Sequence, residues 1–293
     1  NSTIDRTNYP DNGIGAFTIT GADGKNYHYS LPVYNHEILI RSFGMIEDKP
    51  EASSYFEKRQ LEPYATHWLL TAITGPDFID LNNNGYPDKN DHGYWVSFEY
   101  GKWSDAFVWK APYGKEFLVS DENPNIKSTY IGRKQIYYLN KIKTRTHTAL
   151  FVKSLREDNM SYEWTYRSVN KRITPSSGQF QTPRFTIPSQ KSLKLDKIIL
   201  VKTAKDSIDA TSGNLVQNPS QTVDISYTYQ YQKEITAYYN LQDNIIDIAD
   251  NFDINNAIKI IEFKYKDPSE SLAKSTPTSS NSEYGRLTLR QVQ

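Results

Sequence analysis

Residues 77–100, DFIDLNNNGYPDKNDHGYWVSFEY, place a polar turn rich in Asp, Asn and Gly between two apolar, strand-like runs. From Asp80 onward the spacing is D-x-N-x-N-G-x-x-D-x-x-D, with Gly85 at the sixth position. A tightly curled loop of this kind turns alternate side chains inward, where their oxygens can surround a hard cation such as Ca²⁺. The stretch therefore predicts a calcium loop between two strands. The predicted ligands are Asp80, Asn82, Asn84, Tyr86 through its carbonyl, Asp88 and Asp91.

The charge of this loop predicts weak binding. Among the predicted ligands only Asp80, Asp88 and Asp91 are charged, and Asp91 stands where an EF-hand has a longer, bidentate glutamate. We therefore expect weaker closure, or completion by another residue such as Asp77, and a dissociation constant of about 10⁻⁴–10⁻³ M, as in extracellular modules. The alternative is a hairpin turn without metal, since Asn, Asp and Gly are also ordinary turn residues.

The loop resembles those of thrombospondin type-3 repeats and dockerins, which implies a calcium site. It lacks the flanking amphipathic helices of a true EF-hand. Gly75-Pro76 would break a helix upstream, and the downstream run YWVSFEY is strand-like.

The amino-acid composition limits the classes of protein to which this chain can belong. The chain has 293 residues, enough for one or two domains, and its 34 Lys+Arg balance 34 Asp+Glu. A net charge of zero gives no electrostatic case for nucleic acid or an anionic membrane as a partner. The absence of cysteine excludes disulfides and zinc–thiolate sites. No run approaches the roughly 18 apolar residues of a membrane span.

The aromatic content and the alternation of residues predict strands. Tyr, Phe and Trp make up 13% of the chain, and these residues favour strands. The clearest hairpin signal is residues 16–20, a turn at 21–24 and residues 25–34, followed by a further strand at 37–43. Only residues 48–62 suggest a short surface helix. We therefore predict a mainly β fold, with antiparallel, β-sandwich-like sheets, long loops and little helix.

Residues 173–183, ITPSSGQFQTP, have proline near both ends and no strand period. We interpret them as a linker or crossover between an N-terminal β region, residues 1–172, which contains the calcium-type loop, and a C-terminal β region, residues 184–293. Whether the two regions pack as one body stays open. Residues 267–282 are polar and of low complexity, as expected of a mobile loop.

A wider resemblance covers about two thirds of the chain. Runs such as FTITGADGKNYHYSLPVY, GYWVSFEY, LDKIILVK and GRLTLRQV resemble segments of very large secreted bacterial surface proteins with Rhs/YD-repeat-like β architecture, although the YD-repeat motif proper is absent. The resemblance implies export to the cell surface or the extracellular space. It also implies that the chain is a piece of a longer, processed polypeptide whose neighbouring domains are its first partners.

The sequence contains no recognisable catalytic motif. The five histidines are dispersed, with no H-E-x-x-H pair, and there is no G-x-S-x-G elbow. We therefore name no catalytic residue and favour a non-enzymatic module, while a hydrolase assembled from distant residues stays open.

Two aromatic faces provide a second type of candidate site. If exposed, such faces would be platforms for sugar rings or a partner protein, and if buried they would be core. The function we expect first is a structural or adhesive module stiffened by Ca²⁺. The alternative is a carbohydrate-binding module of a secreted multidomain enzyme, with glycans or a surface protein as partner. The platform residues are Tyr162, Trp164, Tyr166, Tyr227, Tyr229 and Tyr231.

Overall fold

The computed structural model describes residues 13–44, 54–60, 63–111, 118–119, 126–161, 164–167, 184–187, 190–202, 214–215, 245–246, 257–265 and 287–293. In these ranges every regular element is a β-strand, so the predicted mainly β, antiparallel fold is confirmed. The helix expected within residues 48–62 is wrong where the chain is described, because residues 54–60 form a strand. Among the residues it describes, the chain has no helix with the length and apolar character needed to cross a bilayer.

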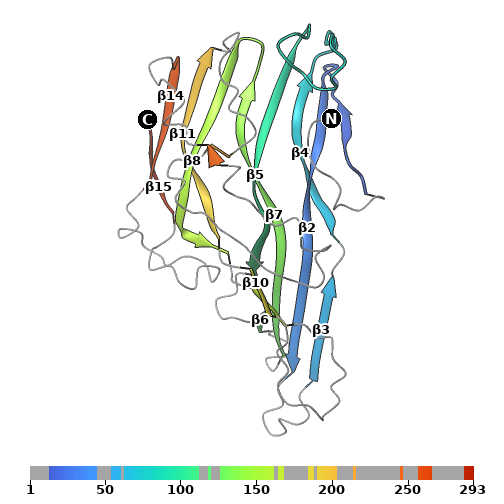
Figure 1. Ribbon diagram of the computed structural model, residues 1–293, viewed down its shortest axis with the longest axis vertical. Helices are drawn as coiled ribbons and strands as arrows, with labels where there is room; N and C mark the ends of the chain where they lie inside the picture. Colours follow the sequence, from blue (N-terminus) through green and yellow to red (C-terminus); the bar gives the residue numbers. More distant parts are fainter. Residues whose placement is uncertain are drawn as a thin grey trace.

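The strands form one large antiparallel sheet and two small pairs (Figure 1). In the large sheet the order is β1-β2-β4-β5-β7-β8-β11-β14-β15, with β3 beside β2 and β6 beside β7. The small pairs are β9 with β10 and β12 with β13. The strands are β1 Phe17–Thr20, β2 Asn26–Gly44, β3 Ser54–Gln60, β4 Tyr64–Thr74, β5 Trp95–Lys110, β6 Leu118–Val119, β7 Ile126–Lys143, β8 His147–Met160, β9 Trp164–Arg167, β10 Arg184–Ile187, β11 Lys191–Lys202, β12 Asn214–Leu215, β13 Ile245–Ile246, β14 Lys259–Tyr265 and β15 Leu289–Val292.

The predicted first hairpin is present. β1 and β2 pair from Phe17↔Tyr29 to Thr20↔Asn26, and the Gly21 N–H donates to the Lys25 carbonyl at 2.8 Å. Gly24 has a φ of 75°, a conformation that side chains with a Cβ rarely adopt, so its place in the turn follows from its lack of one. The strands expected at residues 25–34 and 37–43 are one continuous strand, β2.

β2 is the strand at which the sheet forks. Its first part, up to Asn35, pairs with β4, and its second part pairs with β7. Because β4 also pairs with β5, and β5 with β7, these four strands form a closed ring of pairings. The weakest link in this ring is β4 to β5, where only Ala72–Thr74 and Trp95–Ser97 are paired. Further along, the Tyr100 hydroxyl donates to the Leu70 carbonyl at 3.0 Å and joins the two strands through a side chain.

Buried polar side chains fill the fork. Arg133 Nε donates to Glu37 Oε2 at 2.9 Å, with the two side chains 8% and 0% exposed. The Tyr34 N–H donates to Gln135 Oε1 at 3.1 Å. A buried ion pair gains little net stability over an apolar pair, but breaking it is costly. These contacts between β2 and β7 therefore stabilise the place where β2 changes its pairing partner.

One cluster of the apolar core lies further along the sheet order, on β8, β11 and β14. Leu150 and Val152 of β8 pack with Ile199 and Val201 of β11. β11 follows residue 183 in the chain, yet it is hydrogen-bonded to β8 from the first part, and β14 pairs with β11 in turn. The predicted boundary at residues 173–183 itself lies outside the described residues.

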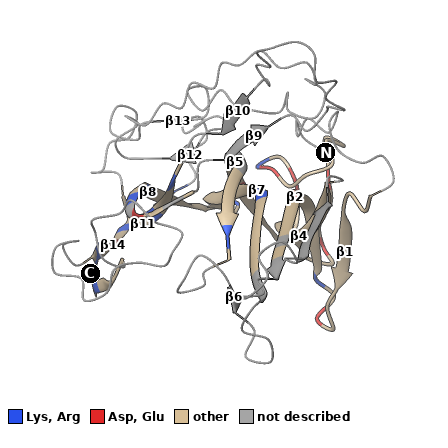
Figure 2. Cartoon of the chain, turned by 90° about the horizontal axis from the view of Figure 1, so that it is seen from below, with Lys and Arg blue, Asp and Glu red and all other residues tan. Residues whose placement is uncertain are grey.

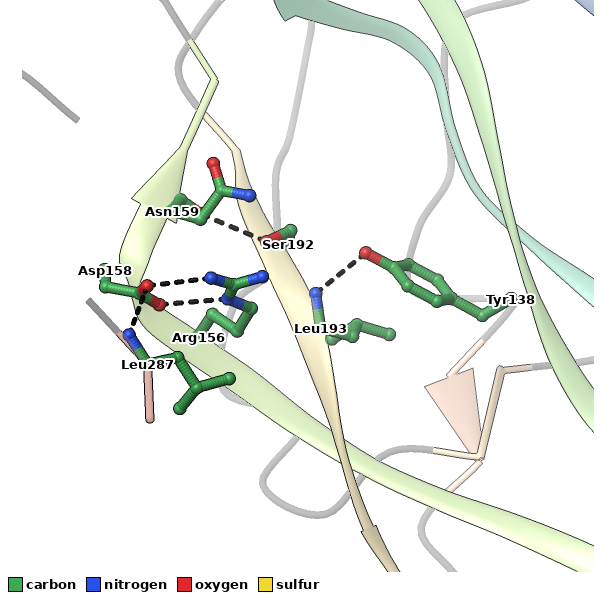
Figure 3. A network of polar contacts seen from close by, with 7 residues as sticks. All are labelled: Tyr138, Arg156, Asp158, Asn159, Ser192, Leu193 and Leu287. Atoms are coloured by element: carbon green, nitrogen blue, oxygen red, sulfur yellow. Dashed lines mark hydrogen bonds and ion pairs between the residues drawn. The ribbon is translucent and has the colours of Figure 1, made fainter. Parts of the chain in front are cut away.

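A polar network anchors the end of β8 (Figure 3). Arg156 holds Asp158 with two hydrogen bonds, at 2.9 and 2.7 Å, and the Leu287 N–H donates to Asp158 Oδ2 at 2.8 Å. The Leu193 N–H donates to the Tyr138 hydroxyl at 2.9 Å, next to a register shift between β8 and β11. These contacts attach the C-terminal segment to β8.

Charged residues of both signs occur on the described strands (Figure 2). β7 is an exception, since it has five basic residues and no acidic one.

Candidate metal centre

The predicted calcium loop joins β4 to β5 and lies at one end of the long axis of the molecule (Figure 1). Its base is a short ladder: the Gly75 N–H donates to the Tyr94 carbonyl at 2.7 Å, and Ile79 and His92 exchange two hydrogen bonds of 3.1 Å. Asp77 accepts a hydrogen bond from the Tyr94 N–H at 3.2 Å. Residues 80–91 are therefore closed off as a compact loop, and Asp77 is engaged at its base.

Backbone conformation produces the tight curl. Asn83 and Gly85 have positive φ values, of 57° and 81°. Asn82 and Asn84 each accept a hydrogen bond from the backbone N–H two residues ahead, at 3.2 and 3.0 Å. Such Asn-based turns curl the chain locally.

Four of the predicted ligands are directed into the loop. The Gly85 N–H donates to Asp80 Oδ2 at 2.9 Å. The side-chain amides of Asn82 and Asn84 both donate to Asp88 Oδ2, at 2.7 and 2.6 Å, so these three side chains meet at one oxygen. The other oxygen of Asp80, Oδ1, is buried and has no hydrogen-bond partner in the part of the chain that the structure describes.

The environment of Asp88 favours its charged form. Burial alone would raise the pKa of this carboxyl, but the hydrogen bonds from the Asn90 N–H and from the amides of Asn82 and Asn84 outweigh it and lower the pKa below its ordinary value. Asp88 is therefore available as an anionic oxygen donor at neutral pH.

Asp91 has a different environment. Its side chain is fully buried, with 0% exposure, and its oxygens accept the backbone N–H groups of Leu81 at 3.1 Å and Asp88 at 2.8 Å. It braces the two limbs of the loop instead of joining the other side chains. Tyr86 has a half-exposed side chain, and its N–H donates to Asn84.

Within the described ranges, no three acidic or histidine side chains gather closely enough to hold a metal ion by themselves. A cation here would need a mixed set of oxygen donors. These would be the carboxylates of Asp80 and Asp88, the amide oxygens of Asn82 and Asn84 and the Tyr86 carbonyl. Such hard, mostly neutral oxygens suit Ca²⁺ better than a transition metal.

No family model, curated protein or solved structure matches this chain.

The predicted aromatic platforms are only partly described. Trp164 and Tyr166 lie in β9, paired with Ile187 and Phe185 of β10, so the backbone of this platform forms a strand as predicted. Tyr162, Tyr227, Tyr229 and Tyr231 lie outside the described residues, as do residues 267–282.

The structure adds one aromatic cluster that is not among the predicted sites. Phe17, which is 40% exposed, stacks on Tyr29 at 5.1 Å and contacts Trp68 edge-on at 5.6 Å. The alternation of residues 16–20 and 27–31 was the available signal for it.

Most of the histidines have local structural contacts. His28 bonds with the hydroxyls of Thr18 and Thr74, and His67 bonds with that of Thr66. His36 lies at the fork of the sheet, where burial first, and then the charges of Arg133 and Lys102, lower its pKa to about 3. We assign none of them a catalytic role.

Proposed function

We propose that the loop at residues 75–94 binds Ca²⁺ and that the chain is a non-enzymatic structural or adhesive module of a large exported bacterial surface protein. The observation that carries the proposal is Oδ1 of Asp80, which is buried and has no hydrogen-bond partner among the described residues, in the loop where Asn82, Asn84 and Asp88 meet. A buried carboxylate oxygen without a partner is costly. A cation in the loop would remove that cost.

The Asn side chains are compatible with this role. Each carboxamide oxygen has two lone pairs, so it can accept a backbone N–H and face a cation at the same time. The hydrogen bonds that now curl the loop at Asn82 and Asn84 therefore need not break.

A bound ion would act where the ring of strands is weakest. β4 and β5 share only three residue pairs, and the loop connects them directly. An ion that binds only the folded loop stabilises it by mass action, by about 1.4 kcal/mol when the free concentration is about ten times the dissociation constant. The role supported is thus mechanical: Ca²⁺ would close the ring at one end of the sheet.

The test is thermal melting in millimolar Ca²⁺ against chelator, with the wild type and two variants. Asp80→Asn keeps an oxygen for the Gly85 N–H but removes the charge, and should abolish the calcium-dependent rise in Tm. Asp23→Asn is the matched control, since Asp23 is an aspartate in a different turn that pairs only with Lys25 among the contacts seen. It should retain the rise. An unchanged wild-type Tm in Ca²⁺ would refute the proposal.

A further inference from the structure

The calcium-type loop also carries an unusual share of exposed apolar side chains. Ile79, Leu81, Tyr86 and Tyr94 are 56, 54, 49 and 47% exposed. We call these four residues the apolar tip. Ile79 and Leu81 flank Asp80 in the chain, and both are more than half exposed on the outside of the loop. Any ion that orders the inner face therefore also fixes the apolar tip in place.

The inner face leaves a cation incompletely surrounded. The candidate donors are one oxygen each from Asp80, Asn82, Asn84, Tyr86 and Asp88, which makes five. Asp91 is not counted, because its buried carboxylate braces the backbone at Leu81 and Asp88 and is seen in no contact with the other donor side chains. Ca²⁺ takes about six to eight oxygens. About one to three positions are thus left for an oxygen from outside the chain.

The charge of the loop determines how a bound divalent ion would change its interaction with an anionic surface. Residues 77–94 contain four Asp and one Lys, a net charge of −3 with His92 neutral, which a divalent ion would reduce to −1. Without the ion this loop repels an anionic surface. With it, most of the repulsion is removed and a cation with open positions lies beside the exposed aliphatic side chains.

From these observations we infer that the loop docks on a phospholipid surface in a Ca²⁺-dependent way, with headgroup phosphate oxygens completing the ion's shell and the apolar tip entering the interface. The inference rests on the proposed function. Two observations favour lipid over a protein partner. The loop lies at one end of the long axis (Figure 1), and four side chains on one loop make a smaller patch than the roughly 800 Å² per partner of a stable protein interface.

The composition of the apolar tip also suits a bilayer interface. Tyrosine is enriched at the headgroup level, where its ring is apolar and its hydroxyl is wet, and aliphatic side chains enter the acyl boundary. Lys25, which is paired with Asp23, lies over the Tyr94 ring at 5.8 Å.

The experiment is co-sedimentation with vesicles of phosphatidylcholine and phosphatidylserine, in Ca²⁺ and in chelator. The double variant Ile79→Ser/Leu81→Ser should lower the partition coefficient about tenfold or more, while keeping the calcium-dependent rise in Tm. Ile19→Ser/Leu289→Ser is the matched control, because those side chains are also about half exposed, at 50% each, but lie on β1 and β15. It should sediment like the wild type. Vesicles of a phosphate-free glycolipid should bind weakly even in Ca²⁺.

The outcomes separate the two proposals. A calcium-dependent rise in Tm without calcium-dependent sedimentation overturns the lipid inference and leaves the calcium site intact. Loss of both overturns both. Equal sedimentation of the Ile79→Ser/Leu81→Ser variant and the wild type also overturns the inference, as does calcium-dependent self-association in light scattering without vesicle binding, which would assign the apolar tip to a protein interface.

Discussion

Mild acid should destabilise this protein through His36. The residue lies at a register shift between β2 and β7, between Asn35 and Glu37, and its Nε2 is buried without a hydrogen-bond partner among the described residues. Burial, followed by the positive charges of Arg133 and Lys102, lowers its pKa from 6.5 to about 3. The ring is therefore neutral in the folded protein at any mildly acidic pH.

The direction and the size of this change in the free energy of unfolding follow from proton linkage. Below pH 6.5 the unfolded chain takes up a proton at His36 that the folded protein does not, so the stability is complete above 6.5 and is lost as the pH falls toward 3. Each pH unit in that window costs about 1.4 kcal/mol. Between about pH 7 and about pH 5 we expect His36 alone to remove about 2 kcal/mol of the free energy of unfolding.

Urea denaturation at a series of pH values tests this, with His36→Gln compared with the wild type at fixed Ca²⁺. Glutamine does not titrate, so the variant should lose about 2 kcal/mol less than the wild type over the interval. His147→Gln is the control, because His147 is exposed and bonds to Thr146. If wild type and His36→Gln lose stability in parallel, His36 protonates freely in the folded state and the reasoning fails.

Three further predictions concern the fork, the loop and the core. Glu37→Gln should lower the free energy of unfolding in urea by about 3–5 kcal/mol, since it leaves Arg133 buried without its anion. Glu262→Gln is the control, in an ion pair with Lys197 whose side chains are 27 and 37% exposed, and should cost less than about 1 kcal/mol. Equal losses would contradict the role of the buried pair at the fork. Gly93→Ala should cost more than about 2 kcal/mol and weaken the calcium-dependent rise in Tm, because its φ is 83° and a Cβ would lie 2.1 Å from the Asp77 carbonyl oxygen. Leu150→Ala should cost about 2–5 kcal/mol, and a loss below about 1 kcal/mol would mean that the cluster around it is loosely packed.

Features set by neighbouring residues could be predicted from the sequence. The hairpin of β1 and β2 follows from alternation around a Gly-containing turn, and the curl of the calcium-type loop follows from Asn and Gly at fixed spacing. Both depend on hydrogen bonds within a short segment. Local sequence preferences therefore determine the hairpin and the curl without a contribution from a distant strand.

Features set by distant pairing could not be predicted. Residues 54–60 contain charged and aromatic residues that fit a surface helix, but β2 offers them a strand partner from Ile38 to Gly44. The fork is a similar case, because nothing local to Asn35 indicates that it pairs with both Tyr64 and Lys134. Strand propensity depends on context in this way.

The candidate site shows the same division at the scale of one residue. Spacing alone assigns Asp91 to the twelfth position of a calcium loop, yet its carboxylate is drawn to the N–H groups of Leu81 and Asp88. Spacing identifies which side chains can point inward. It does not identify which of them will instead accept hydrogen bonds from backbone N–H groups.

The position of the loop explains why a weak ion could still matter mechanically. β4 is paired with β2 along most of its length, and β5 is paired with β7 in the same way, so each strand is held firmly on one side. Across the ring, β4 and β5 have three residue pairs, the Tyr100–Leu70 hydrogen bond and the ladder at the base of the loop. Separating them breaks few backbone pairs, and the ladder is the part that an ion in the loop would stiffen. A contribution of about one or two kcal/mol is small compared with the stability of the whole sheet, but it is large compared with what holds β4 to β5. Calcium would thus control local opening at the end of the molecule that carries the apolar tip, and leave the core between β8 and β11 unaffected.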